Sequence, residues 1–193
     1  MTVALMLFLL AALLPVFFAK LRVLPLWLSV QGLALAAMDW VQAPAPTLHS
    51  LATLLEVLLL RAALAPWLLR RAMVLCGGAE RDLMPSNLFT WVAAVSLIAL
   101  AFHFFGASSS APDALALGVV ATLVLLAFLL LASNAAPLAQ LVALLYIENA
   151  IAVFEALLPQ GWPLPVHLAL GLVYLGTITV AQWLLGQRTE ASL

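Results

Sequence analysis

Charged residues are scarce in this chain of 193 residues. Lys, Arg, Asp and Glu make up 8% of it, whereas hydrophobic residues make up 67% and the mean hydropathy is +1.22. Soluble domains carry about 25% charged residues, so the composition excludes an ordinary soluble protein. The net charge of −1 gives no reason to expect a nucleic acid partner. The partner that this composition predicts is the lipid bilayer.

Cysteine is almost as scarce, since Cys76 is the only one. One cysteine excludes an internal disulfide and a cysteine-rich zinc site, and it cannot hold an iron–sulfur centre by itself. The sequence also has no nucleophile–base set, no phosphate-binding glycine loop and no cluster of metal ligands. We therefore expect no cofactor and no catalytic residues in this chain.

Long apolar runs dominate what is present. Runs of about 20 residues match the thickness of a bilayer core, and they are apolar on every face, which excludes the alternating strands of a β-barrel. The runs cover approximately residues 2–19, 23–41, 48–69, 88–105, 114–132, 138–158 and 164–186. The sequence thus predicts an all-α, polytopic transmembrane bundle of about seven spanning helices, forming a single transmembrane domain, 1–193.

The basic residues predict the orientation of this bundle. Lys20 and Arg22 follow the first apolar run instead of preceding it, so we interpret that run as a spanning helix and not as a signal peptide. With seven spans, six of the seven basic residues fall on one side, which the positive-inside rule makes cytoplasmic. The N-terminus is then outside and the C-terminus cytoplasmic. These six residues are Lys20, Arg22, Arg70, Arg71, Arg81 and Arg188.

Two acids lie in the sixth apolar run, Glu148 and Glu155. Seven residues make almost two turns of an α-helix, so both side chains share one face, roughly 10 Å apart along the axis. An ionisable group at the centre of a membrane span costs at least about 2.5 kcal/mol. A pair of acids that exchange protons can act as a relay. The alternative is structural, with Glu148 protonated or paired with Arg61 to hold the bundle together.

The third apolar run contains Glu56 and Arg61, and the last contains His167 near its start. Side chains five residues apart diverge by about 140° on an α-helix, so we expect Glu56 and Arg61 to face different neighbours or to meet only through their length. Pro66 is expected to kink this helix. The pair is either a structural clamp or part of a proton path, in which His167 could also take part.

The segment Gln140–Phe154, QLVALLYIENAIAVF, resembles the signature of the hydrogenase-4 component E family, where an apolar helix carries a Met-Glu-Asn-Gly core. That family is related to the K subunit of complex I and to the C subunit of Mrp-type antiporters. The third run, with Glu56, Arg61 and Pro66, is similar to the family's helix with a buried lysine. Where the family has two acids in its last helix, this chain has His167 and Val173.

The resemblance implies a membrane-arm subunit of a complex I-like or group 4 [NiFe]-hydrogenase-type assembly, similar to formate hydrogenlyase. It implies antiporter-like membrane subunits as partners, with nickel-iron and iron–sulfur centres in partner subunits, and a bacterial-type inner membrane. The proton-transfer candidates are Glu148, Glu155, Glu56, Arg61 and His167. Two alternatives stay open: a purely structural subunit of such a complex, and an independent small ion transporter.

Overall fold

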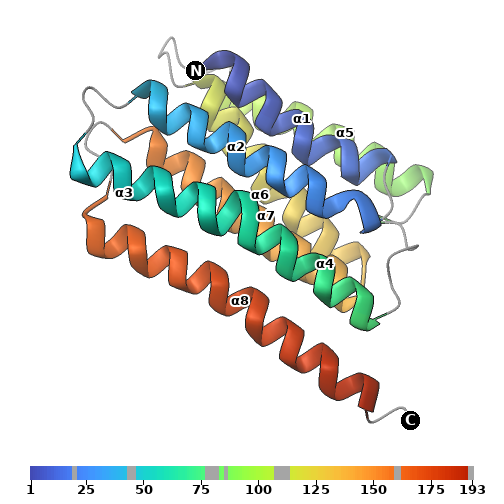
Figure 1. The fold of residues 1–193 in the computed structure, drawn as a ribbon. Helices are drawn as coiled ribbons and strands as arrows, with labels where there is room; N and C mark the ends of the chain where they lie inside the picture. The colour runs from blue at the N-terminus through green and yellow to red at the C-terminus, as the bar shows by residue number, and fades with distance from the viewer. Residues whose placement is uncertain are drawn as a thin grey trace. The chain divides into compact units, whose positions relative to one another are not determined.

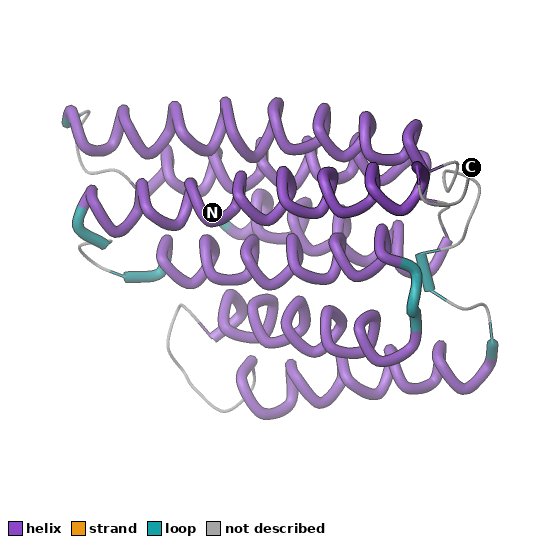
Figure 2. Tube along the Cα trace, turned by 90° about the horizontal axis from the view of Figure 1, so that it is seen from below, coloured by secondary structure: helices purple, strands orange, loops and turns teal. Residues whose placement is uncertain are grey.

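The computed structural model is helical, and its described part contains no strand (Figure 1; Figure 2). The described residues are 1–18, 21–42, 47–76, 83–84, 87–106, 114–158 and 162–190. In this part, six helical segments are long and apolar enough to cross a membrane, which confirms the predicted all-α polytopic bundle. The helix over the first predicted span, Thr2–Phe18, is shorter, with 17 residues.

The chain divides into two compact units. Unit 1 comprises Met1–Asp82 and Trp162–Leu193, and unit 2 comprises Leu83–Gly161. The helices of unit 1 are α1 (Thr2–Phe18), η1 (Leu21–Val23), α2 (Leu24–Gln42), α3 (Leu48–Glu56), η2 (Val57–Leu64), α4 (Ala65–Cys76) and α8 (Leu164–Glu190). Those of unit 2 are α5 (Leu88–Ala101), η3 (Phe102–Gly106), α6 (Ala114–Ser133) and α7 (Pro137–Ala156). The organisation as a single transmembrane domain stays a prediction.

In unit 1, α3, η2 and α4 join end to end into one helical rod. The rod begins as predicted, because Thr47 and Ser50 form a reciprocal cap: the Ser50 N–H donates to Thr47 Oγ1 at 3.1 Å and the Thr47 N–H to Ser50 Oγ at 2.8 Å. The rod ends later than the predicted residue 69. Arg70 and Arg71 are exposed residues of α4, because long basic side chains can reach the membrane surface from a continuing helix.

The helices of unit 1 pack in sequence, α1 against α2, α2 against the rod, and the rod against α8 (Figure 1). Gly32 of α2 makes a close approach to the rod possible. A β-carbon there would lie 2.6 Å from the backbone nitrogen of Ala62 in η2. In unit 2, α6 packs against α7, α5 and η3. In unit 1, the rod therefore packs between α2 and α8.

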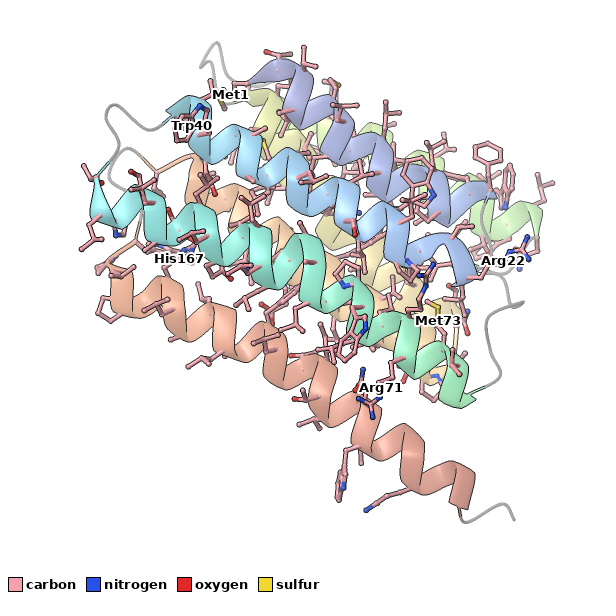
Figure 3. All side chains as sticks on the ribbon, viewed as in Figure 1. Met1, Arg22, Trp40, Arg71, Met73 and His167 are labelled. Atoms are coloured by element: carbon pink, nitrogen blue, oxygen red, sulfur yellow. The ribbon has the colours of Figure 1, made fainter. Side chains whose placement is uncertain are left out.

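Two basic residues of unit 1 lie at the same end of it. Arg22 and Arg71 lie at one end, whereas Met1 and Trp40 lie at the other (Figure 3). This is the arrangement that the positive-inside prediction requires for these residues. Lys20 and Arg81 lie outside the described residues, as does the side chain of Arg188.

Candidate functional site

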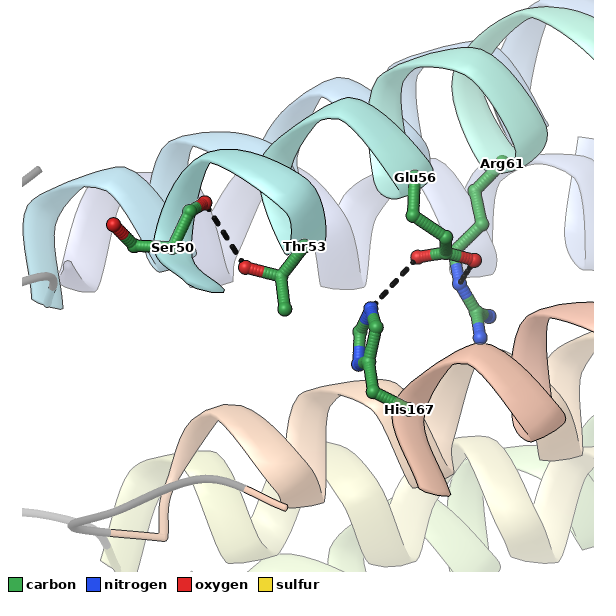
Figure 4. Close-up of polar contacts among 5 residues, drawn as sticks. All are labelled: Ser50, Thr53, Glu56, Arg61 and His167. Carbon is green, nitrogen blue, oxygen red and sulfur yellow. Dashed lines mark hydrogen bonds and ion pairs between the residues drawn. The ribbon is translucent and has the colours of Figure 1, made fainter. Parts of the chain in front are cut away.

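Three of the predicted site residues meet inside unit 1. His167 Nε2 lies 3.1 Å from Glu56 Oε2, and Arg61 Nε lies 3.8 Å from Glu56 Oε1 (Figure 4). The side chains are 5% exposed for Glu56 and Arg61 and 8% for His167. Arg61 is also the middle residue of the 27-residue span Leu48–Val74. The structure thus brings together a carboxylate, a guanidinium and an imidazole, with Arg61 at the middle of its span and His167 near the start of α8.

Of the two alternatives predicted for Glu56 and Arg61, the one in which they face different neighbours is wrong, because Arg61 Nε lies 3.8 Å from Glu56 Oε1. They meet, and the rod is not α-helical between them. Val57–Leu64 is a π-helix, in which each N–H bonds to the carbonyl five residues back, as the Ala65 N–H does to the Leu60 oxygen. One extra residue in each turn brings side chains five apart onto the same face. This local change of helix type lets Glu56 and Arg61 form a pair within one helix.

Pro66 marks the end of the π-helical segment. Proline has no N–H, so residue 66 cannot donate the bond that an α-helix would form with the carbonyl of Ala62. The helix type changes at Leu64–Ala65, directly before this proline. A change of hydrogen-bond register is therefore found next to Pro66, and the kink stays a prediction. Such π-helical turns occur frequently at functional sites.

One stripe of α8 faces the rod. The four residues His167, Gly171, Tyr174 and Ile178 are buried and spaced four, three and four apart, so they share one face. Gln182 continues the stripe and donates from Nε2 to the Leu68 carbonyl. Because residues along α8 meet successively later residues of the rod, the two helices run in the same direction. That is the relation expected between the third and seventh of seven spans.

Tyr174 is the cluster member that the sequence analysis did not single out. Arg61 Cζ lies 4.5 Å from the centroid of its ring, and Tyr174 is fully buried. A guanidinium over an aromatic face gains electrostatic attraction, more so away from water. The available signal was the spacing, since Tyr174 follows His167 by seven residues and so lies on the same face of the helix. Arg61 is thereby held between Glu56 and an aromatic ring.

Tyr174→Leu is expected to lower the free energy of unfolding by about 0.5–2 kcal/mol through loss of the cation–π contact alone. Tyr174→Phe keeps the ring and is the matched control, with an expected effect well below that of leucine. The measurement is thermal unfolding of the purified chain in detergent. Equal losses in the two variants would contradict a role for the ring face.

Glu148 and Glu155 belong to unit 2, whereas the Glu56–Arg61–His167 cluster belongs to unit 1. Both are on α7, on one face as predicted, but they are half-buried and not buried. Their face is the less buried side of α7, which also carries Gln140, Leu144 and Ile151. The acid that pairs with Arg61 inside unit 1 is Glu56. Val173 is 53% exposed and does not belong to the stripe of α8 that faces the rod.

When His167 is neutral the cluster has no net charge, because the negative charge of Glu56 cancels the positive charge of Arg61. Arginine keeps its proton under all ordinary conditions, whereas histidine and a carboxyl group can exchange one across a 3.1 Å contact. Among the described residues, no group of three or more His, Cys, Asp and Glu is placed to hold a metal ion. The expectation of a chain without cofactors stays a prediction.

No family model matches the chain, and no curated protein or solved structure is recognisably similar to it.

Proposed function

We propose that this chain is a membrane-arm subunit of a complex I-like or group 4 [NiFe]-hydrogenase-type assembly and contributes buried charges to proton or sodium translocation. The observation that supports the proposal is the Glu56–Arg61–His167 cluster. In this proposal the assembly lies in a bacterial-type inner membrane. Antiporter-like membrane subunits are its partners in the bilayer, and nickel-iron and iron–sulfur centres belong to other subunits.

Within the cluster, the residues take different parts. Arg61 is a fixed positive charge that faces the Glu56 carboxylate inside the span. His167 accepts and returns a proton at Nε2, opposite Glu56 Oε2. A proton on His167 leaves the cluster with a net positive charge, which favours its onward transfer. Glu148 and Glu155 on α7 would connect to charged residues in the neighbouring antiporter-like subunits.

A structural subunit is the main alternative, because buried ions need partners whether or not they conduct. His167 favours translocation over this alternative. Arg61 already neutralises Glu56, so a clamp gains little from a third group that can take up a proton. An independent small transporter is the other alternative, and the purification below distinguishes it.

The parent assembly is tested by isolating the tagged, full-length chain from its native membrane in mild detergent and identifying the proteins that co-purify. A large antiporter-like chain together with hydrogenase-like or dehydrogenase-like soluble subunits is expected. A chain that purifies alone, as a monomer or homo-oligomer, and moves an ion in liposomes would contradict the subunit proposal and favour the transporter.

Glu148→Gln is expected to abolish ion translocation by the assembled complex while leaving its subunit composition unchanged, because the amide keeps the shape but cannot carry a proton. The measurement is proton uptake into inverted membrane vesicles, with complex assembly followed on native gels. Gln140→Leu is the control, since it removes a polar group from the same side of α7 without removing an acid. Full assembly with undiminished translocation in Glu148→Gln would overturn the role of this acid.

A further inference from the structure

Gly171 lies on the buried stripe of α8, between His167 and Tyr174, directly against Glu56. A β-carbon at Gly171 would lie 2.8 Å from Glu56 Oε1, 3.2 Å from Leu60 Cδ1 and 3.4 Å from Glu56 Cδ. Contacts of a β-carbon below 3.0 Å are essentially never seen, so this carbon and the carboxylate could not both keep their places. Because Gly171 has no side chain, the Glu56 carboxylate can lie directly against α8 at this position.

We propose that Gly171 is a positioning residue for Glu56 and sets the contact between Glu56 and His167. The atoms that a β-carbon would meet belong to the far ends of the Glu56 and Leu60 side chains and not to backbone. The helices therefore keep their places in Gly171→Ala, and the carboxylate moves away from α8. His167 is on α8, so its 3.1 Å contact with Glu56 lengthens, whereas Arg61 lies on the same rod as Glu56.

The chain contains two glycines that separate this effect from general packing. A β-carbon at Gly32 meets the backbone of Ala62, so alanine there must displace a helix. A β-carbon at Gly176, on α8 itself, meets nothing within 4 Å. Gly176→Ala is therefore the matched control for Gly171→Ala. Because alanine is the better helix former, a loss seen only at residue 171 cannot arise from helix propensity.

The first test rests on the proposed function and measures proton translocation by the assembled complex. Gly171→Ala is expected to slow it roughly tenfold, less than the ~100-fold that an ångström of misplacement can cause, and Gly176→Ala is expected to leave it unchanged. His167→Gln combined with Gly171→Ala is expected to be no slower than His167→Gln alone, because both act through one contact. Independent, multiplying losses would overturn the proposal.

The second test does not depend on the function. The apparent melting temperature of the full chain in detergent is expected to fall in Gly171→Ala relative to Gly176→Ala. This difference is expected to shrink when Glu56→Ala removes the closest opposing atom, because only the 3.2 Å contact with Leu60 Cδ1 then remains. The Glu56→Ala/Arg61→Leu background gives the same comparison if the single variant does not fold. A difference that persists undiminished without Glu56, or no difference at all, contradicts the positioning role.

The two tests also separate the two proposals. A melting difference that depends on Glu56, together with unchanged translocation in Gly171→Ala, supports the positioning role and contradicts the proposed function. Loss of translocation in Gly171→Ala without a melting difference that depends on Glu56 contradicts the positioning role alone.

Discussion

Replacing Glu56 with leucine is expected to lower the free energy of unfolding by about 3–5 kcal/mol, the loss typical of removing one partner from a buried ion pair. The substitution leaves the guanidinium of Arg61 in the apolar interior without its carboxylate and takes from His167 its partner on the rod. The measurement is thermal or denaturant unfolding of the purified chain in detergent, with helix content followed by circular dichroism.

The double variant Glu56→Leu/Arg61→Leu is expected to recover much of this loss, because replacing a whole buried ion pair with apolar groups is often neutral or stabilising. Arg71→Leu is the control, since Arg71 is exposed on the same rod and such substitutions usually stay within about 0.5 kcal/mol. A loss in Glu56→Leu no larger than in Arg71→Leu, or a double variant that adds to the loss, would contradict a buried and mutually neutralised pair.

The fold was largely predictable because a membrane span must be long and apolar, which is a property of composition over a window. The residues of the cluster were predictable for a related reason: Glu56, Arg61 and His167 are ionisable groups within apolar runs. Their pairing was not. It depends on a π-helical segment, and the prediction assumed an α-helical register throughout the span. Pro66 was the local signal, but it indicates a disturbed helix without specifying which kind.

The sequence also did not allow us to predict which face of each helix is buried. A membrane helix is apolar all round, so the contrast between polar and apolar faces that marks the core side of a soluble helix is missing. The spacing of Glu148 and Glu155 therefore predicted a shared face correctly but not that this face is only half-buried. For the same reason the stripe of α8 that includes Gly171 and Tyr174 became visible only with the rod beside it.

A proton relay and a structural clamp predict the most different results for substitutions of His167. His167→Gln is expected to slow translocation by about 10²-fold or more, the contribution typical of a positioned proton donor and acceptor, while the complex still assembles. Glutamine can place an N–H near Glu56 Oε2, where His167 Nε2 now lies at 3.1 Å, but it cannot take up a proton and return it. Translocation is measured in inverted vesicles, normalised to the amount of assembled complex.

A clamp predicts the opposite pattern from the same residue. If His167 only satisfies Glu56, glutamine preserves translocation because it preserves the hydrogen bond, and His167→Leu impairs assembly because it removes the bond from a buried carboxylate. His103→Gln is the control, since His103 is exposed at the end of its helix in unit 2 and its loss is expected to change neither property. The His167→Gln variant thus separates hydrogen bonding from proton exchange, because glutamine can form the hydrogen bond but cannot exchange a proton.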